Sequence, residues 1–147
     1  MLRISLIGAV IVALTVVIHA IGTTLWVNRF ARRHADETFW QSRMAIAVLI
    51  KTVLILITLH AIEIVLWAGS YIVLLPDGEL ASFEEAVYFS FVTFTTLGYG
   101  DITLSEGWRL LSGIEALNGV LLIGWTTAML FAVVQRMWRG RASNNNY

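Results

Sequence analysis

The residues with the most specific chemistry form one short stretch, TTLGYGD, at positions 95–101. Its glycines, Gly98 and Gly100, alternate with larger residues and permit left-handed backbone angles at every second position. Alternating angles can aim successive carbonyl oxygens the same way, and hard cations prefer oxygen ligands. One such segment offers a single column of oxygens, whereas four around a symmetry axis would offer stacked rings, with the Thr96 hydroxyl adding another. The stretch therefore favours a dehydrated monovalent cation as its ligand.

The preceding segment, residues 83–96, is too short to cross a membrane as a helix and too apolar for an ordinary loop. We expect a re-entrant helix whose start is marked by a capping box of Ser82 and Glu85. Glu84 and Glu85 also lie at the positive end of its dipole. Non-helical backbone that returns from such a helix must be buried in protein or line a water-filled cavity. The negative end of the helix then points toward that cavity.

The rest of the sequence must hold this segment in a membrane. Of 147 residues, 58% are hydrophobic and 14% charged, whereas a soluble domain carries about a quarter charged residues. Runs at residues 4–27, 44–75 and 110–134 are long enough to span a bilayer. The first run exceeds the apolar region of a signal peptide and is followed by arginines, which favours a retained anchor. Because the sequence has one proline and no cysteine, we expect no disulfide framework and no zinc or thiol-redox site.

The charged residues indicate how the spans are oriented. The formal net charge is zero, which argues against a nucleic-acid binder, yet the two signs are separated along the chain. The side that the positive-inside rule makes cytoplasmic holds eight of the ten basic residues: Arg29, Arg32, Arg33, Arg43, Lys51, Arg136, Arg139 and Arg141. The other side holds seven acidic residues: Asp77, Glu79, Glu84, Glu85, Asp101, Glu106 and Glu115. We expect an outer N-terminus, a cytoplasmic C-terminus and an acidic vestibule that attracts cations.

At residues 96–101, TLGYGD, the sequence resembles the potassium-channel signature. The resemblance extends from about Met44 to Arg136 and is similar to the two-helix pore module of small bacterial potassium channels. It implies a pore domain over residues 44–138, with an outer helix, a pore helix, a filter and an inner helix. Residues 1–43 would add a transmembrane helix and a basic cytoplasmic connection, and residues 139–147 would form a short cytoplasmic tail.

The resemblance implies a role for each filter residue. The filter would comprise Thr96, Leu97, Gly98, Tyr99 and Gly100. Potassium would bind the carbonyl oxygens of the first four of these residues, with the Thr96 hydroxyl as a further ligand. Asp101 would support the filter, together with Tyr88, whose side chain can reach Asp101.

Three positions depart from the common pattern of that family. Leu97 replaces the commoner valine, but this side chain points away from the pore. Val92 stands where some bacterial channels carry a glutamate that bonds the outer aspartate, and Phe89 stands where a tryptophan often braces the filter tyrosine. Neither Val92 nor Phe89 has a side-chain hydrogen-bonding group, so we expect a less rigid filter, with the contact from Tyr88 to Asp101 remaining.

The third apolar run would be the inner helix. By resemblance, Gly119 falls on the gating-hinge position. The residues that would line a water-filled cavity are Val120, Ile123 and Thr127. Phe131 and Gln135 are candidate constrictions, and Phe131 is the better one because apolar constrictions gate by dewetting.

Ionisable residues within the expected spans have two interpretations. His60 and Glu63 lie on one helix face near mid-membrane, where such groups are costly and often functional. Either they sense pH, or a neutral Glu63 bonds to the first helix with His60 similarly satisfied, and the second is favoured. His19 is expected to be packed or hydrogen-bonded, and no spacing of His and Glu resembles a metalloenzyme motif. Glu115 is either a vestibule charge or the partner of Arg109.

The sequence thus predicts an all-α membrane protein with three transmembrane helices, a re-entrant pore helix and a selectivity filter. It would assemble as a homotetramer, because one filter strand cannot surround an ion. We expect passive, potassium-selective permeation across the bacterial inner membrane, with lipid and K⁺ as partners and no cofactor, nucleic acid or catalysis. The alternatives are a weakly selective cation channel and a non-conducting subunit that regulates a partner. The first span could pack outside the pore, brace neighbouring subunits or sit loosely in lipid.

Overall fold

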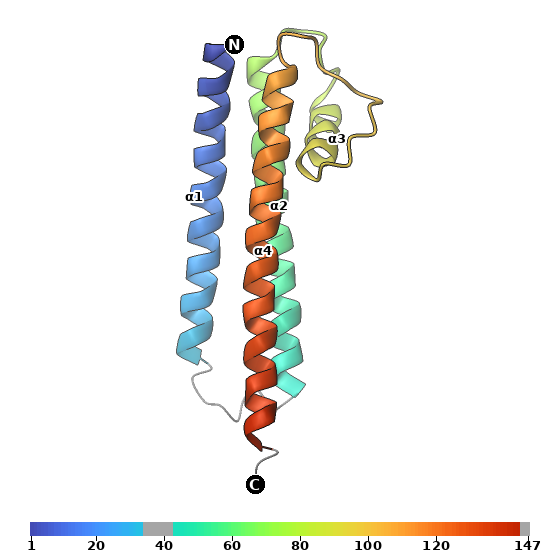
Figure 1. Ribbon diagram of the computed structural model, residues 1–147. Coiled ribbons are helices and arrows are strands. Elements are labelled where there is room, and N and C mark those ends of the chain that lie inside the picture. The colour runs from blue at the N-terminus through green and yellow to red at the C-terminus, as the bar shows by residue number, and fades with distance from the viewer. Residues whose placement is uncertain (34–42, 145–147) are drawn as a thin grey trace.

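The computed structural model describes residues 1–33 and 43–144, which contain four helices and no strand. Three of these helices are long enough and apolar enough to cross a membrane (Figure 1). The bounds of the four are α1 Leu2–Arg33, α2 Arg43–Leu74, α3 Phe83–Phe94 and α4 Arg109–Asn144. The prediction of an all-α membrane protein with three spans and one short additional helix is confirmed.

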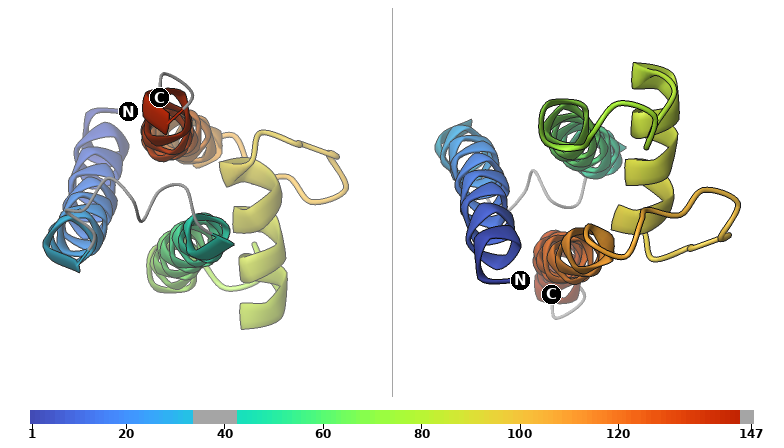
Figure 2. Two further views of the ribbon diagram at one scale, coloured as in Figure 1. Left: turned by 90° about the horizontal axis from the view of Figure 1, so that it is seen from below. Right: turned by 90° about the horizontal axis from the view of Figure 1, so that it is seen from above.

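The three long helices run side by side, and the short helix α3 lies against one side of them (Figures 1 and 2). α3 contacts α2 and α4, and α1 contacts the same two helices from the other side. The N-terminus lies at the same end of the bundle as the loops on either side of α3, and the C-terminus lies at the opposite end. The acidic loops and the N-terminus therefore share one end.

Several helix ends differ from the apolar runs that predicted them, and α1 continues past the expected end at Val27 to Arg33. α4 continues past the expected end at Val134 to Asn144, because glutamine, methionine and arginine are good helix formers outside an apolar run. α3 ends at Phe94, before the expected end at Thr96. The φ angle of Thr96 is +58°, which no right-handed helix can accommodate.

The core lies where α2, α3 and α4 meet. Trp67 and Tyr71 of α2 are completely buried, and the Tyr71 ring meets Phe89 of α3 edge to face with centroids 5.3 Å apart. Aromatic pairs in this geometry contribute about 0.5–1.5 kcal/mol beyond their buried area. Phe94 of α3 and Leu122 of α4 belong to the same buried cluster. This core holds α3 against two spans and so positions the segment that follows α3.

α1 is attached to its own chain by specific contacts. Asn118 Nδ2 of α4 donates a hydrogen bond to the buried Thr15 Oγ1 at 2.9 Å. Trp26 Nε1 donates to Thr52 Oγ1 of α2 at 3.0 Å. Polar side chains that pair across an apolar interface fix the relative register of the helices. The first span therefore packs on α2 and α4 and does not sit loosely in lipid.

A cluster of polar side chains adds a third contact of α1. His19 Nδ1 lies 2.8 Å from Glu63 Oε1, and His60 Nδ1 lies 2.9 Å from Glu63 Oε2. His60 Nε2 in turn lies 2.9 Å from Thr126 Oγ1 of α4. The predictions that Glu63 hydrogen-bonds to the first helix and that His19 is a hydrogen-bonded histidine are confirmed.

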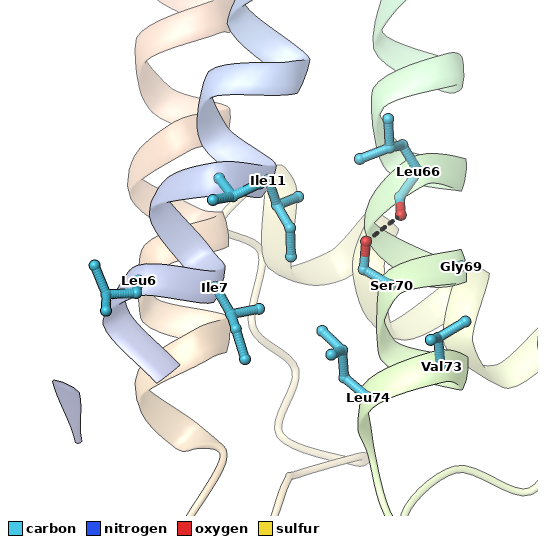
Figure 3. A pocket seen from close by; sticks show the side chains of 9 residues that line it. Leu6, Ile7, Ile11, Leu66, Gly69, Ser70, Val73 and Leu74 are labelled. Carbon is cyan, nitrogen blue, oxygen red and sulfur yellow. Dashed lines mark hydrogen bonds between the residues drawn. The ribbon is translucent and has the colours of Figure 1, made fainter. Parts of the chain in front are cut away.

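An apolar cavity of about 570 Å³ lies between the first part of α1 and the last part of α2 (Figure 3). Its lining is aliphatic apart from Ser70, whose hydroxyl donates to the Leu66 carbonyl at 2.8 Å. The lining residues are Leu6, Ile7, Val10, Ile11, Leu66, Gly69, Ser70, Val73 and Leu74. Since the Ser70 hydroxyl already has a hydrogen-bond acceptor within its own helix, an occupant of the cavity need not offer it one.

We expect Gly22→Val to destabilise the protein, because an added Cβ would lie 2.5 Å from Leu59 Cδ2 at the contact of α1 with α2. Overpacking of this kind costs about 1–3 kcal/mol. Gly69→Val is the matched control, since a Cβ there meets nothing within 4 Å and the change in helix propensity is the same. Thermal unfolding in detergent micelles should give a lower midpoint for Gly22→Val alone. Equal midpoints would contradict the packing of α1.

Candidate functional site

α3 has a defined start that fixes its position along the chain. Ser82 has extended backbone, and its hydroxyl oxygen accepts a hydrogen bond from the Glu85 N–H at 3.1 Å. The Glu85 carboxylate accepts from the N–H of Ala81 at 2.5 Å, one residue before the partner expected in a capping box. Together these bonds satisfy backbone donors at the helix start, so that α3 presents its C-terminal end to residues 95–101.

Residues 96–100, called the filter segment below, have the alternating backbone expected of them. The φ angle is +58° at Thr96, +54° at Gly98 and +78° at Gly100, and it is not positive at Leu97 or Tyr99. Glycine adopts such angles without steric cost, whereas a β-branched threonine does so only where its surroundings enforce it. The two glycines could be identified from sequence, but the left-handed Thr96 extends the alternation by one further residue.

The backbone amides of the filter segment turn back toward α3. The N–H of Thr96 donates to the Thr93 carbonyl at 2.9 Å, and the N–H groups of Leu97 and Gly98 donate to the Val92 carbonyl at 2.9 and 3.3 Å. Within the described residues, by contrast, no hydrogen bond engages the carbonyl oxygens of the segment. Oxygens without internal partners are free to serve as ion ligands.

The filter segment lies on the outside of the single chain, on the far side of α3 from α1 (Figure 2). The side chains of Leu97 and Tyr99 are 52% and 68% exposed. A cavity of about 220 Å³ lies behind the segment, and Val92, Gly98 and Arg109 are among the residues that line it. The single chain therefore does not enclose the filter segment.

One side-chain hydrogen bond connects α3 to the residue that follows the filter segment. The Tyr88 hydroxyl donates to Asp101 Oδ2 at 2.7 Å, which is the contact predicted from the sequence. This bond favours the ionised carboxylate, so it lowers the pKa of Asp101, and it raises the pKa of Tyr88. It joins the residue that follows the filter segment to Tyr88 of α3.

Glu115 of α4 forms a second connection, deep in the protein behind α3. This carboxyl group is completely buried and accepts a hydrogen bond from the Tyr71 hydroxyl of α2 at 2.6 Å. It also contacts the hydroxyl of Ser90, which lies on the buried face of α3 and 3.1 Å from the Ile64 carbonyl of α2. One acidic side chain thereby bonds to both helices that flank it.

Both sequence expectations for Glu115 were wrong. Its side chain does not reach the outer vestibule, and Arg109 donates instead to the carbonyl of Leu104 at 3.2 Å. The physical reason is helix geometry, because residues six apart project from different sides of a helix. A polar side chain in the first turns of an otherwise apolar run was the available signal that the position is buried and paired.

Gly119 has a packing role that the sequence did not reveal. A Cβ at this position would lie 1.9 Å from the carbonyl oxygen of Phe94, the last residue of α3. Only glycine allows α3 and α4 to approach this closely. α4 is continuous through Gly119 in this structure, and the hinge role stays a prediction.

The residues predicted to line a cavity lie on one exposed stripe of α4. Their spacing of three or four residues places Val120, Ile123 and Thr127 on the same helix face. Phe131, the predicted constriction, lies one turn further along that face and is also exposed. The Thr127 hydroxyl donates to the Ile123 carbonyl at 2.9 Å, so its hydrogen is used within the helix. Gln135, the other candidate constriction, is half-buried.

We expect Glu115→Leu to destabilise the protein by about 1–3 kcal/mol, because it leaves the buried Tyr71 hydroxyl without its acceptor. Tyr71→Phe in the same chain removes the stranded donor and should recover part of this loss. Unfolding free energies of the two single variants and the double variant, measured in micelles, check the coupling. Strictly additive losses would show that the two side chains do not interact.

Tyr88→Phe should raise the pKa of Asp101 toward its ordinary value, since the hydroxyl that stabilises the carboxylate is gone. A depressed carboxyl pKa contributes stability above its ordinary range, and this contribution is lost as the pH falls through the lowered value. Titration of the Asp101 carboxyl carbon by NMR in the wild-type and Tyr88→Phe proteins measures the direction of the pKa change. An unchanged Asp101 titration would mean that the hydrogen bond is not formed in solution.

The matched family accounts for every element that positions the filter segment. A family model described as ion channel covers residues 44–136, which include α2, α3, the filter segment and most of α4. No solved structure matches the chain. α1 lies before the matched residues, as an addition to the channel domain. With well over half of its residues in that match, the chain belongs to the ion channel family.

Proposed function

We propose that the protein is the subunit of a homotetrameric, potassium-selective channel through which K⁺ passes down its electrochemical gradient. The supporting observation is the filter segment, with positive φ angles at Thr96, Gly98 and Gly100 and carbonyl oxygens that have no partner within the described residues. Carbonyl oxygens can replace the hydration shell of K⁺ and thereby select it over Na⁺.

The proposed K⁺ ligands are backbone oxygens with one hydroxyl in addition. They are the carbonyl oxygens of Thr96, Leu97, Gly98 and Tyr99, together with the Thr96 hydroxyl. The hydrogen bonds of the segment's amides to Val92 and Thr93 support this assignment, because they leave the carbonyl side unoccupied. The C-terminal end of α3 carries the negative end of the helix dipole and favours a cation nearby.

Four chains are proposed because one chain forms only one wall of the site. Leu97 and Tyr99 are largely exposed in the single chain, and neighbouring subunits would cover them. The exposed stripe of α4 that contains Val120 and Thr127 would then face a central water-filled cavity. Phe131 would narrow the cavity at its cytoplasmic end.

We place the N-terminus outside and the C-terminus in the cytoplasm of a bacterial inner membrane, on the positive-inside rule. The acidic loops would then lie at the outer mouth and raise the local concentration of cations. Glu79 supports this role, because its carboxylate accepts a hydrogen bond from the Ser105 N–H at 3.0 Å. That bond lowers the pKa of Glu79 and keeps the side chain negatively charged.

A weakly selective cation channel is the second candidate, and the cavity of about 220 Å³ behind the filter segment favours it. Phe89 and Val92, which line this cavity, have no side-chain donor or acceptor to brace the segment. A segment that can relax would let its carbonyl oxygens close around the smaller Na⁺ as well. Selectivity by flexible carbonyl dipoles depends on this freedom being limited.

Cation flux into liposomes that contain only the purified protein tests the proposal. We expect uptake of K⁺ well above that of Na⁺, with block by Ba²⁺. Gly98→Ala should abolish selective flux, because the φ angle of +54° costs an L-residue about 1–2 kcal/mol at each of four subunits. Gly78→Ala is the matched control, since Gly78 also has a positive φ, +93°, but lies outside the filter segment.

Each outcome distinguishes one candidate from the others. Comparable K⁺ and Na⁺ flux that is lost in Gly98→Ala supports the weakly selective channel. Unchanged selectivity in Gly98→Ala would contradict the assignment of the filter segment. Absence of flux over a wide range of pH and voltage would exclude conduction by this chain alone.

A further inference from the structure

The polar cluster of His19, His60 and Glu63 lies inside the helix bundle, within the spans and apart from the filter segment. His19 and Glu63 are completely buried, and the side chain of His60 is 17% exposed. The two imidazole rings stack with their centroids 5.4 Å apart, and each directs Nδ1 at a different oxygen of the Glu63 carboxyl group. Three side chains thus each offer one potential metal-ligand atom, and these atoms lie within 4.8 Å of one another.

The charge of this cluster is balanced by its own side chains only if one of the histidines is protonated. An ionised Glu63 between two neutral imidazoles leaves one negative charge in the interior of the bundle, where an uncompensated charge is costly. The hydrogen-bonding partners of Glu63 in the structure are these two histidines. A cation held among the three side chains would compensate the charge and retain all three as partners.

The ligand types and distances fit a transition-metal ion. Imidazole nitrogen and carboxylate oxygen are the common zinc ligands besides thiolate. One ligand atom from each of the three residues lies within 4.8 Å of the others, and the bonded pairs are 2.8 and 2.9 Å apart. Two ligands of one tetrahedral ion, each about 2.1 Å from it, lie about 3.4 Å apart. Metal entry therefore requires each imidazole nitrogen to move about 0.5 Å away from the carboxylate oxygen that it faces.

The surroundings of His60 agree with ligation through Nδ1. His60 Nε2 would then carry the ring proton, and Thr126 Oγ1 lies 2.9 Å away to accept it. Metal-bound histidines commonly have such an acceptor on the other nitrogen. His19 Nε2 is buried and has no hydrogen-bond partner among the described residues, so ligation through Nδ1 would leave this nitrogen without an acceptor for its proton.

We propose that His19, His60 and Glu63 form an intramembrane binding site for a divalent transition-metal ion, with Zn²⁺ as the best fit. Three protein ligands leave the fourth position open to water or another small ligand. The bound ion would fasten α1 to α2 and, through Thr126, stabilise their contact with α4. Spacing along the chain could not reveal this site, because His19 lies 44 residues from Glu63. The proposal does not depend on ion permeation.

Titration of the purified full chain with Co²⁺ tests the site directly. Protein in detergent micelles is first stripped with a chelator, and the visible absorption of four-coordinate Co²⁺ is followed. We expect a saturable signal at one ion per chain, which Zn²⁺ removes by displacement. Zn²⁺ should also raise the thermal midpoint of the wild-type chain, because ligand that binds only the folded state stabilises it.

Variants identify the ligands. His19→Gln and Glu63→Gln should abolish the Co²⁺ signal, whereas Glu84→Gln and His34→Gln, which alter the same residue types elsewhere, should retain it. Thr126→Val keeps every ligand and changes little volume, and it should weaken the affinity by roughly tenfold. Circular dichroism and elution volume report whether each variant folds. If the ligand variants do not fold, the metal affinity of Thr126→Val tests whether the ion binds at this cluster.

Two results would overturn the proposal. The first is a wild-type chain that gives no saturable Co²⁺ signal and no Zn²⁺-dependent rise in the thermal midpoint. The three side chains would then bind protons and no metal ion. The second is binding that persists unchanged in folded His19→Gln or Glu63→Gln, or in Thr126→Val where those do not fold, because the ion would then bind elsewhere.

Discussion

Backbone carbonyl groups inside a membrane need partners, and those of the filter segment have none among the residues that the structure describes. The cost of this arrangement is acceptable only where cations or neighbouring protein occupy the carbonyl side. The alternating angles at Thr96, Gly98 and Gly100 prevent the segment from forming a helix that would satisfy these groups internally. Much of the surrounding structure serves to hold backbone in this otherwise unfavourable state.

Three features hold the segment from behind. The amides of Leu97 and Gly98 bond to the last turn of α3 through the Val92 carbonyl. α3 in turn contacts α4 at Gly119 without an intervening side chain. Glu115 bonds α4 to both α2 and α3 from a completely buried position. A movement of α4 would therefore act on α3 and on the segment that follows it.

α1 adds a further layer that the matched channel domain does not include. It is attached through paired polar groups at three levels of the bundle, from Thr15 through His19 to Trp26. Such pairs are directional, so they specify one placement of α1 where a uniformly apolar face would allow several. The contact of His19 with Glu63 is also the one that brings α1 to the proposed metal site.

The sequence by itself determined the number of spans, the start of α3 and the alternation at Gly98 and Gly100, because hydropathy, capping and glycine act through neighbouring residues. It also predicted the contact of Tyr88 with Asp101 by resemblance. Only the tertiary structure decided the partners of Glu115, the approach of Gly119 to Phe94 and the meeting of His19 with Glu63. These depend on how helices distant in sequence rotate and pack against each other. The apolar runs carry almost no periodicity that specifies this rotation, since a helix in lipid is apolar on nearly every side.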